Sequence, residues 1–115
     1  MAAAPTVVVK PTSWPGVVKF KYTCDATPAA GPVNCGFVPG LVVLWNVTDK
    51  DVVTVWSEGM ADATAITWGT AAAAVSSGGI TPIAQTDGTN HGFQVGTDTS
   101  VQEASKVFEG YAIRA

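Results

Sequence analysis

Apolar and polar residues alternate with the two-residue period of β-strands over several short stretches of the chain. In VVKFKY at 17–22, the apolar Val18, Phe20 and Tyr22 alternate with two lysines. Further strands are expected where apolar runs lie between turn-forming residues, at 41–57, 63–68, 92–96 and 106–115. The pattern predicts an all-β protein, an antiparallel β-sandwich or small barrel of about seven to eight short strands.

Two segments depart from this alternation. Residues 1–15 are expected to form an extended N-terminal arm, because their three prolines remove backbone donors and favour extended geometry. The run of Val7, Val8 and Val9 could add a strand to a sheet edge, in this molecule or in a neighbour. Residues 16–115 then form a single β-sandwich domain. The alanine-rich stretch GTAAAAVSSGG is expected to be a strand or turn, since it is too short to hold a helix without tertiary support.

The stretch GLVVLWNVTDKDVVTVWSEGM at 40–60 indicates a hairpin that is apolar on both faces. A small antiparallel sheet normally buries one face and exposes the other to water. Symmetric closure of the TDKD turn would place Trp45 opposite Thr54 and Val43 opposite Trp56. Val43 and both tryptophans would then share one face.

Three interpretations of this surplus apolar face stay open. It can be the core of the sandwich, with the opposite face covered by the arm or a loop. It can be an interface with a partner, which would then include Val43, Trp45 and Trp56 together with the valines of the arm. It can also be a sugar-stacking platform, because aromatic rings offer flat apolar area.

Charge limits the choice of partners. Charged residues make up 13% of the chain, below the roughly 25% of ordinary soluble domains. The net charge is −3 and no basic stripe is present, so nucleic acid is not an expected partner. The sequence has neither the features of a signal peptide nor a membrane-length apolar run, so no membrane association is expected. We therefore expect the protein to be made in a cytosol.

Little in the sequence predicts chemistry. Cys24 and Cys35 bracket a Pro- and Gly-rich loop, either as reduced thiols or as a disulfide formed after release into an oxidising medium. Two cysteines and one distant histidine form a poor zinc set, and no cofactor or metal is expected. His91 could act in a hydrolase only if a serine and Asp87 or Asp98 lay beside it. No catalytic motif is present, and we expect no enzyme.

Four segments resemble a group of small structural proteins of tailed bacteriophages. They are CGFVPGLVVLWNVTD, WSEGMADATAITW, SSGGITPIAQTDG and HGFQVGTDTSVQEASKVFEGYAIRA, within residues 35–115. The shared features are a Gly-Phe-x-Pro entry into a hydrophobic strand, a Ser-Gly-Gly-Ile-Thr-Pro turn and a Gly-Phe-x-Val-Gly-x-Asp segment before the closing strand. These are landmarks of turns and strands, and residues 1–34 share none of them.

The resemblance implies a virion protein without enzymatic activity. It suggests a capsid decoration (cement) protein, made in the host bacterial cytoplasm and bound to the capsid surface. Such a protein would bridge copies of the major capsid protein and contact copies of itself, with a trimer as one arrangement. The alternative is a tail component or host-surface adhesin with a glycan-binding β-sandwich.

Overall fold

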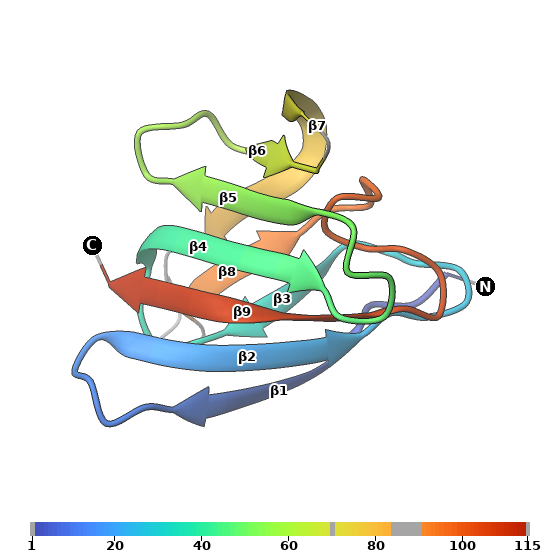
Figure 1. The fold of residues 1–115 in the computed structure, drawn as a ribbon. Helices are drawn as coiled ribbons and strands as arrows, with labels where there is room; N and C mark the ends of the chain where they lie inside the picture. The colour runs from blue at the N-terminus through green and yellow to red at the C-terminus, as the bar shows by residue number, and fades with distance from the viewer. Residues whose placement is uncertain (1, 70, 84–90, 115) are drawn as a thin grey trace.

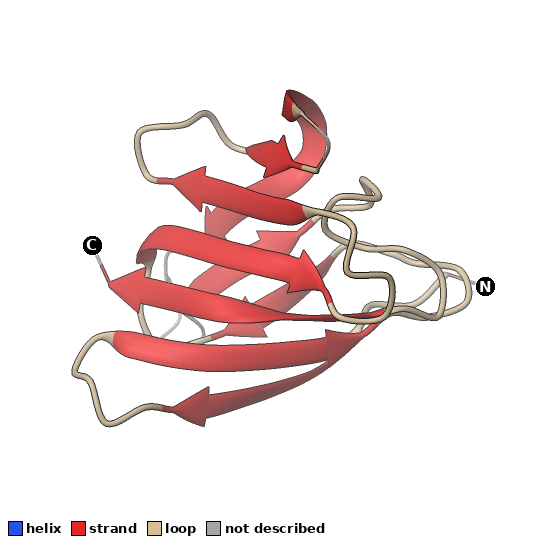
Figure 2. Ribbon diagram, viewed as in Figure 1, coloured by secondary structure: helices blue, strands red, loops and turns tan. Residues whose placement is uncertain are grey.

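The computed structural model describes residues 2–69, 71–83 and 91–114, and all of its regular structure is β. These residues contain no helix, as Figure 2 shows, so the prediction of an all-β protein is confirmed. The strands are β1 (Thr6–Pro11), β2 (Val17–Thr23), β3 (Gly31–Asn34), β4 (Pro39–Asn46), β5 (Val53–Ser57), β6 (Thr64–Trp68), β7 (Ala72–Ile83), β8 (Gly92–Val95) and β9 (Val107–Arg114).

The strands form one antiparallel sheet in the order β1-β2-β9-β4-β5-β6-β7-β8-β3, which curls into a nearly closed barrel (Figure 1). The described part of the chain thus holds nine strands, more than the seven to eight expected. The two ends of the sheet meet near Ala3. The Ala3 amide donates to the Thr27 carbonyl at 3.0 Å, and the Ala29 amide donates to the Ala3 carbonyl at 2.9 Å.

The expected N-terminal arm is not seen in the described residues 2–15. Residues 6–11 instead form β1, which pairs with β2 from Thr6 opposite Thr23 to Pro11 opposite Val18. Val7 and Val9 pack against the core. The reason is that Val7 and Val9 lie on the inward side of β1, and they gain more by covering the core of their own molecule than by remaining in water.

The inward faces of the strands meet in one aromatic core. Tyr22 on β2 stacks on Phe108 of β9, with ring centroids 5.5 Å apart. Phe20 contacts Phe93 of β8 across the barrel in an edge-to-face arrangement at 5.2 Å. The Tyr22 hydroxyl donates to the Val101 carbonyl, and burial raises the pKa of this phenol well above its ordinary value. The barrel is therefore filled by side chains.

The β4–β5 hairpin has a different register from the one expected. Trp45 lies opposite Val53, and Val42 lies opposite Trp56. The connection between the paired residues Trp45 and Val53 runs over residues 46–52, instead of the expected four-residue turn at 48–51. Within it Lys50 adopts the left-handed conformation, with φ of 57°. A shift of one residue moves a side chain to the other face of the sheet. Trp56 is consequently buried in the core and Trp45 faces outward, so the prediction that they share a face is wrong.

β7 pairs with a different strand along each of its two edges. On one edge residues 72–75 and Ile80 pair with β6, and on the other edge residues 80–83 pair with β8. The pairing with β6 is interrupted between Val75 and Ile80, around Gly78, whose φ of +72° is rarely adopted by other residues. The alanine-rich stretch is thus a strand, one of the two structures expected for it. Together with β6 it forms a hairpin at one end of the molecule (Figure 1).

Close strand packing makes Gly110 on β9 a sensitive position. A Cβ atom at this residue would lie 2.0 Å from the Val43 carbonyl oxygen and 2.9 Å from the Leu44 Cβ. We expect Gly110→Ala to lower the free energy of unfolding by about 1–3 kcal/mol, because the strands would have to separate. Denaturant titration measures the change. Gly59→Ala is the control, since a Cβ there meets nothing within 4 Å, and equal losses in both variants would contradict the prediction.

Candidate functional site: an outer apolar face

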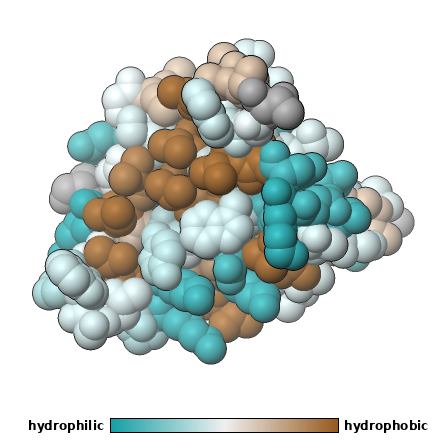
Figure 3. Space-filling model, in the orientation of Figure 1, coloured by the Kyte–Doolittle hydropathy of each residue, from teal (hydrophilic) through white to brown (hydrophobic). Residues whose placement is uncertain are grey.

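Four neighbouring strands, β9, β4, β5 and β6, direct apolar side chains away from the core. We call this surface the outer apolar face. Figure 3 shows apolar atoms extending across the middle of the molecule, with hydrophilic atoms beside and below them. The face consists of Leu41, Val43, Trp45, Val53, Val55, Ile66, Trp68, Tyr111 and Ile113.

Strand register aligns these residues in rows. In one row Trp45 lies opposite Val53, which lies opposite Trp68. In the next row Val43 lies between Tyr111 of β9 and Val55 of β5. Neighbouring strands lie about 4.8 Å apart, so the side chains within a row touch or nearly touch. The apolar side chains therefore form one surface instead of isolated points.

Much of this surface is exposed to water. Trp68 is 64% exposed, Ile66 49%, and Val53 and Tyr111 38% each. Single exposed apolar residues are common in soluble proteins, but a contiguous apolar patch usually marks a binding site. The position of these residues on the central strands of the sheet makes the surface rigid.

The two outward tryptophans flank a shallow hollow. The Trp45 indole N–H donates to Glu109 Oε1 at 3.3 Å, and its ring lies 6.2 Å from that of Tyr111. These contacts hold the indole in place. The hollow has a volume of about 340 Å³, and its lining includes Trp45, Trp68, Lys50 and Asp51. It combines flat aromatic walls with two charged groups at its rim.

A basic rim borders the face on the outer side of β2 and β1. Lys10 and Lys19 lie directly opposite each other, a pairing of like charges that weakens a sheet. Lys21 lies opposite Glu109. The three lysines thus form a positive border beside the apolar surface, where they could orient an acidic partner.

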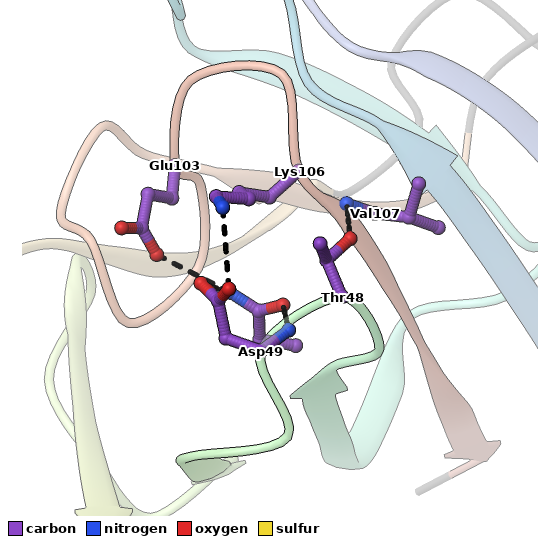
Figure 4. A network of polar contacts seen from close by, with 6 residues as sticks. Thr48, Asp49, Glu103, Lys106 and Val107 are labelled. Atoms are coloured by element: carbon purple, nitrogen blue, oxygen red, sulfur yellow. Dashed lines mark hydrogen bonds and ion pairs between the residues drawn. The ribbon is translucent and has the colours of Figure 1, made fainter.

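A polar network holds the β4–β5 turn against the segment that precedes β9 (Figure 4). The side-chain amide of the buried Asn46 donates hydrogen bonds to Asp49 Oδ2 and to Glu103 Oε2, both at 3.2 Å. Lys106 Nζ lies 3.2 Å from Asp49 Oδ1, and the Val107 amide donates to the Thr48 hydroxyl at 3.0 Å. This network fixes the turn, and with it the register that directs Trp45 outward.

The structure brings together only part of the predicted interface. Val43 and Trp45 lie on the outer apolar face, whereas Trp56 is 1% exposed and belongs to the core. Val8 points outward, but Lys21 and Glu109 separate it from the face.

Sequence reasoning missed Ile66, Trp68 and Tyr111 as members of the face. Ile66 and Trp68 alternate along TAITW and Tyr111 belongs to a predicted strand. The alternation of apolar residues predicted these strands, but it did not show which side of each strand would face the core.

The structure describes only part of the residues considered for chemistry. Asp98 accepts hydrogen bonds from the Ser100 amide and hydroxyl, while Asp87 lies outside the described residues. Among the described residues, no group of three or more His, Cys, Asp or Glu is placed to hold a metal ion. Cys24 and Cys35 are both buried free thiols.

Comparison with protein-family models, with characterised proteins and with solved structures finds no match to this chain. In the part of the chain that the structure describes, no helix is long and apolar enough to cross a membrane. The functional interpretation therefore rests on the geometry of the outer apolar face.

The buried thiols should make stability depend on pH in the alkaline range. Burial raises the pKa of Cys24 and Cys35 above the ordinary thiol value of 9.0. As the pH rises above 9.0, the thiols of the unfolded chain lose their protons before those of the folded protein. The free energy of unfolding is therefore unchanged below pH 9.0 and falls as the pH rises toward the raised pKa values of the folded protein. Denaturant titrations between about pH 8 and 10 should show this fall. A Cys24→Ala/Cys35→Ala variant should show a shallower one, and an unchanged slope would contradict the prediction.

Asn46 should contribute strongly to stability for its size. Asn46→Ala removes its hydrogen bonds to Asp49 and Glu103 and leaves a space beside them, so we expect a loss of about 1–3 kcal/mol in the free energy of unfolding. Asn34→Ala is the control because Asn34 is exposed at the end of β3. Thermal or denaturant unfolding checks both variants, and similar stability of the two would argue against the network.

Proposed function

We propose that the chain is a structural protein of a bacteriophage virion, a capsid decoration protein that binds the major capsid protein through the outer apolar face. The observation that carries the proposal is the continuous apolar surface on β9, β4, β5 and β6. The resemblance of residues 35–115 to small phage structural proteins supports the virion as the setting. In this proposal the protein is made in the host bacterial cytoplasm and acts on the capsid surface, where it bridges capsid subunits.

Energetics favour a protein surface as the partner of this face. Covering a large apolar side chain contributes about 1.5–3 kcal/mol, and Trp and Tyr are among the residues that dominate protein interfaces. Trp45, Trp68 and Tyr111 are three such residues on one rigid surface. A rigid face of this kind loses little conformational entropy on binding, which suits permanent attachment.

The surroundings of the face support a defined orientation on the capsid. The lysines of β1 and β2 lie on one side of it, whereas Lys50 and Asp51 line the hollow between Trp45 and Trp68. Charges at the rim of an interface steer association and select one orientation. The basic rim would therefore meet an acidic part of the capsid surface.

Replacement of Trp68 should weaken attachment to the capsid. Trp68→Ser removes the most exposed aromatic residue of the face, and we expect at least a tenfold loss in affinity for capsids assembled without this protein. Co-sedimentation of the purified variant with those capsids measures the loss.

Trp14→Ser is the matched control. Trp14 is 74% exposed, against 64% for Trp68, but it lies in the β1–β2 turn outside the face. Wild-type binding by Trp14→Ser together with weak binding by Trp68→Ser would support the proposal. The reverse result would assign attachment to the β1–β2 turn, and full binding by both variants would refute the role of the face.

The hollow between Trp45 and Trp68 favours one alternative, a tail component or host-surface adhesin that binds glycans. Indole faces stack on sugar rings, and the Lys50 and Asp51 side chains at the rim could bind hydroxyl groups. A glycan array tests this alternative directly. Binding that Trp45→Ala abolishes would support the adhesin, whereas capsid binding without any glycan signal would support decoration.

A further inference from the structure

The first half of β7 has an open edge. On one side residues 72–75 pair with β6, but on the other side β8 reaches only residues 80–83. Among the described residues, no backbone hydrogen bond engages that other side of residues 72–77. The residues from Ala72 to Ala74 are exposed. A row of backbone donors and acceptors is therefore available to another strand.

The composition of this edge differs from that of the two terminal edges of the sheet. Natural proteins protect open edges with proline, with lysine or with short strands. β1 ends in Lys10-Pro11, and β3 is four residues long and contains Pro32. The segment AAAVSS at 72–77 contains no charge and no proline. Of these three edges it alone lacks protection against pairing with another chain.

We propose that this edge pairs antiparallel with the same edge of a second copy, so that the sheet continues across a two-fold axis. Such an interface places identical segments opposite each other, which requires a segment compatible with itself. Like charges on opposed strands would destabilise the pair, and this segment has none. Its small side chains allow the two backbones to approach to hydrogen-bonding distance.

Continuity with the outer apolar face favours a second copy over a foreign strand. Ala74 lies opposite Ile66 and Ala72 lies opposite Trp68, so the alanines extend the rows of that face to the open edge. Pairing across the two-fold axis joins the two outer apolar faces through a strip of small apolar residues. The dimer thus covers the exposed β6–β7 hairpin, which on its own has few packing partners. The dimer is expected to form independently of the partner that the outer apolar face binds.

Charge variants at Ala73 test the dimer. The wild type is expected to have twice the chain mass of 11.8 kDa in light scattering after size exclusion. Ala73→Lys and Ala73→Glu each place like charges near the two-fold axis, so the mass of each variant alone should fall by half. A mixture of the two should recover the dimer, because the opposed charges then attract. Ala104→Lys, at an exposed alanine in the loop before β9, should remain a dimer.

Every outcome decides the proposal, provided that circular dichroism shows each variant to be folded. A monomeric wild type, a trimer, or a dimer that persists in both charge variants would overturn it. Failure of the mixture to form a heterodimer would overturn the edge-to-edge geometry. Dissociation by Trp68→Ser but not by Ala73→Lys would assign the contact to the outer apolar face instead. Loss in both charge variants with recovery in their mixture would establish the edge.

Discussion

The register of the β4–β5 hairpin is the constraint on which the rest of the molecule depends. Trp45 and Trp56 are separated by a turn, and a shift of one residue decides whether they share a face of the sheet or whether Trp56 alone enters the core. The buried Asn46 amide binds Asp49 within the turn and Glu103 near β9, and so fixes that choice. Glu103 lies in the segment before β9, which itself pairs with β4 from Pro39 to Asn46. The polar network thus supports the register that sets both the filling of the barrel and the composition of its outer surface.

The strands could be predicted from the sequence because alternation and turn residues are local signals. TAITW and KVFEGYAI reveal strands without knowledge of their neighbours. The hairpin register could not be predicted in this way, because it depends on a left-handed Lys50 and on a contact from Asn46 to a residue 57 positions away. The candidate site was foreseen at Val43 and Trp45. Ile66, Trp68 and Tyr111 join them only through the order of strands in the sheet, which is a long-range property.

The inner and outer surfaces of the barrel differ in composition. Phe20, Phe93 and Phe108 fill the interior, and one outward sector remains apolar beside a sector of lysines. The lysine pair at Lys10 and Lys19 and the exposed Trp68 each oppose stability or solubility in an isolated molecule. Such features lower the stability or solubility of the free protein, and binding of a partner would remove this disadvantage. The unprotected edge of β7 is a third feature of this kind.

The position of β9 in the sheet has a consequence for biosynthesis. Among the strands that the structure describes, β9 comes last along the chain, yet it lies between β2 and β4 near the middle of the β1–β5 side. The hairpins of β1–β2 and β4–β5 can therefore form during translation, but they cannot join until β9 has left the ribosome. Until then the facing edges of β2 and β4 remain open. Slow synthesis or truncation before residue 107 should favour misassembly, and the low charge of the chain would do little to prevent it.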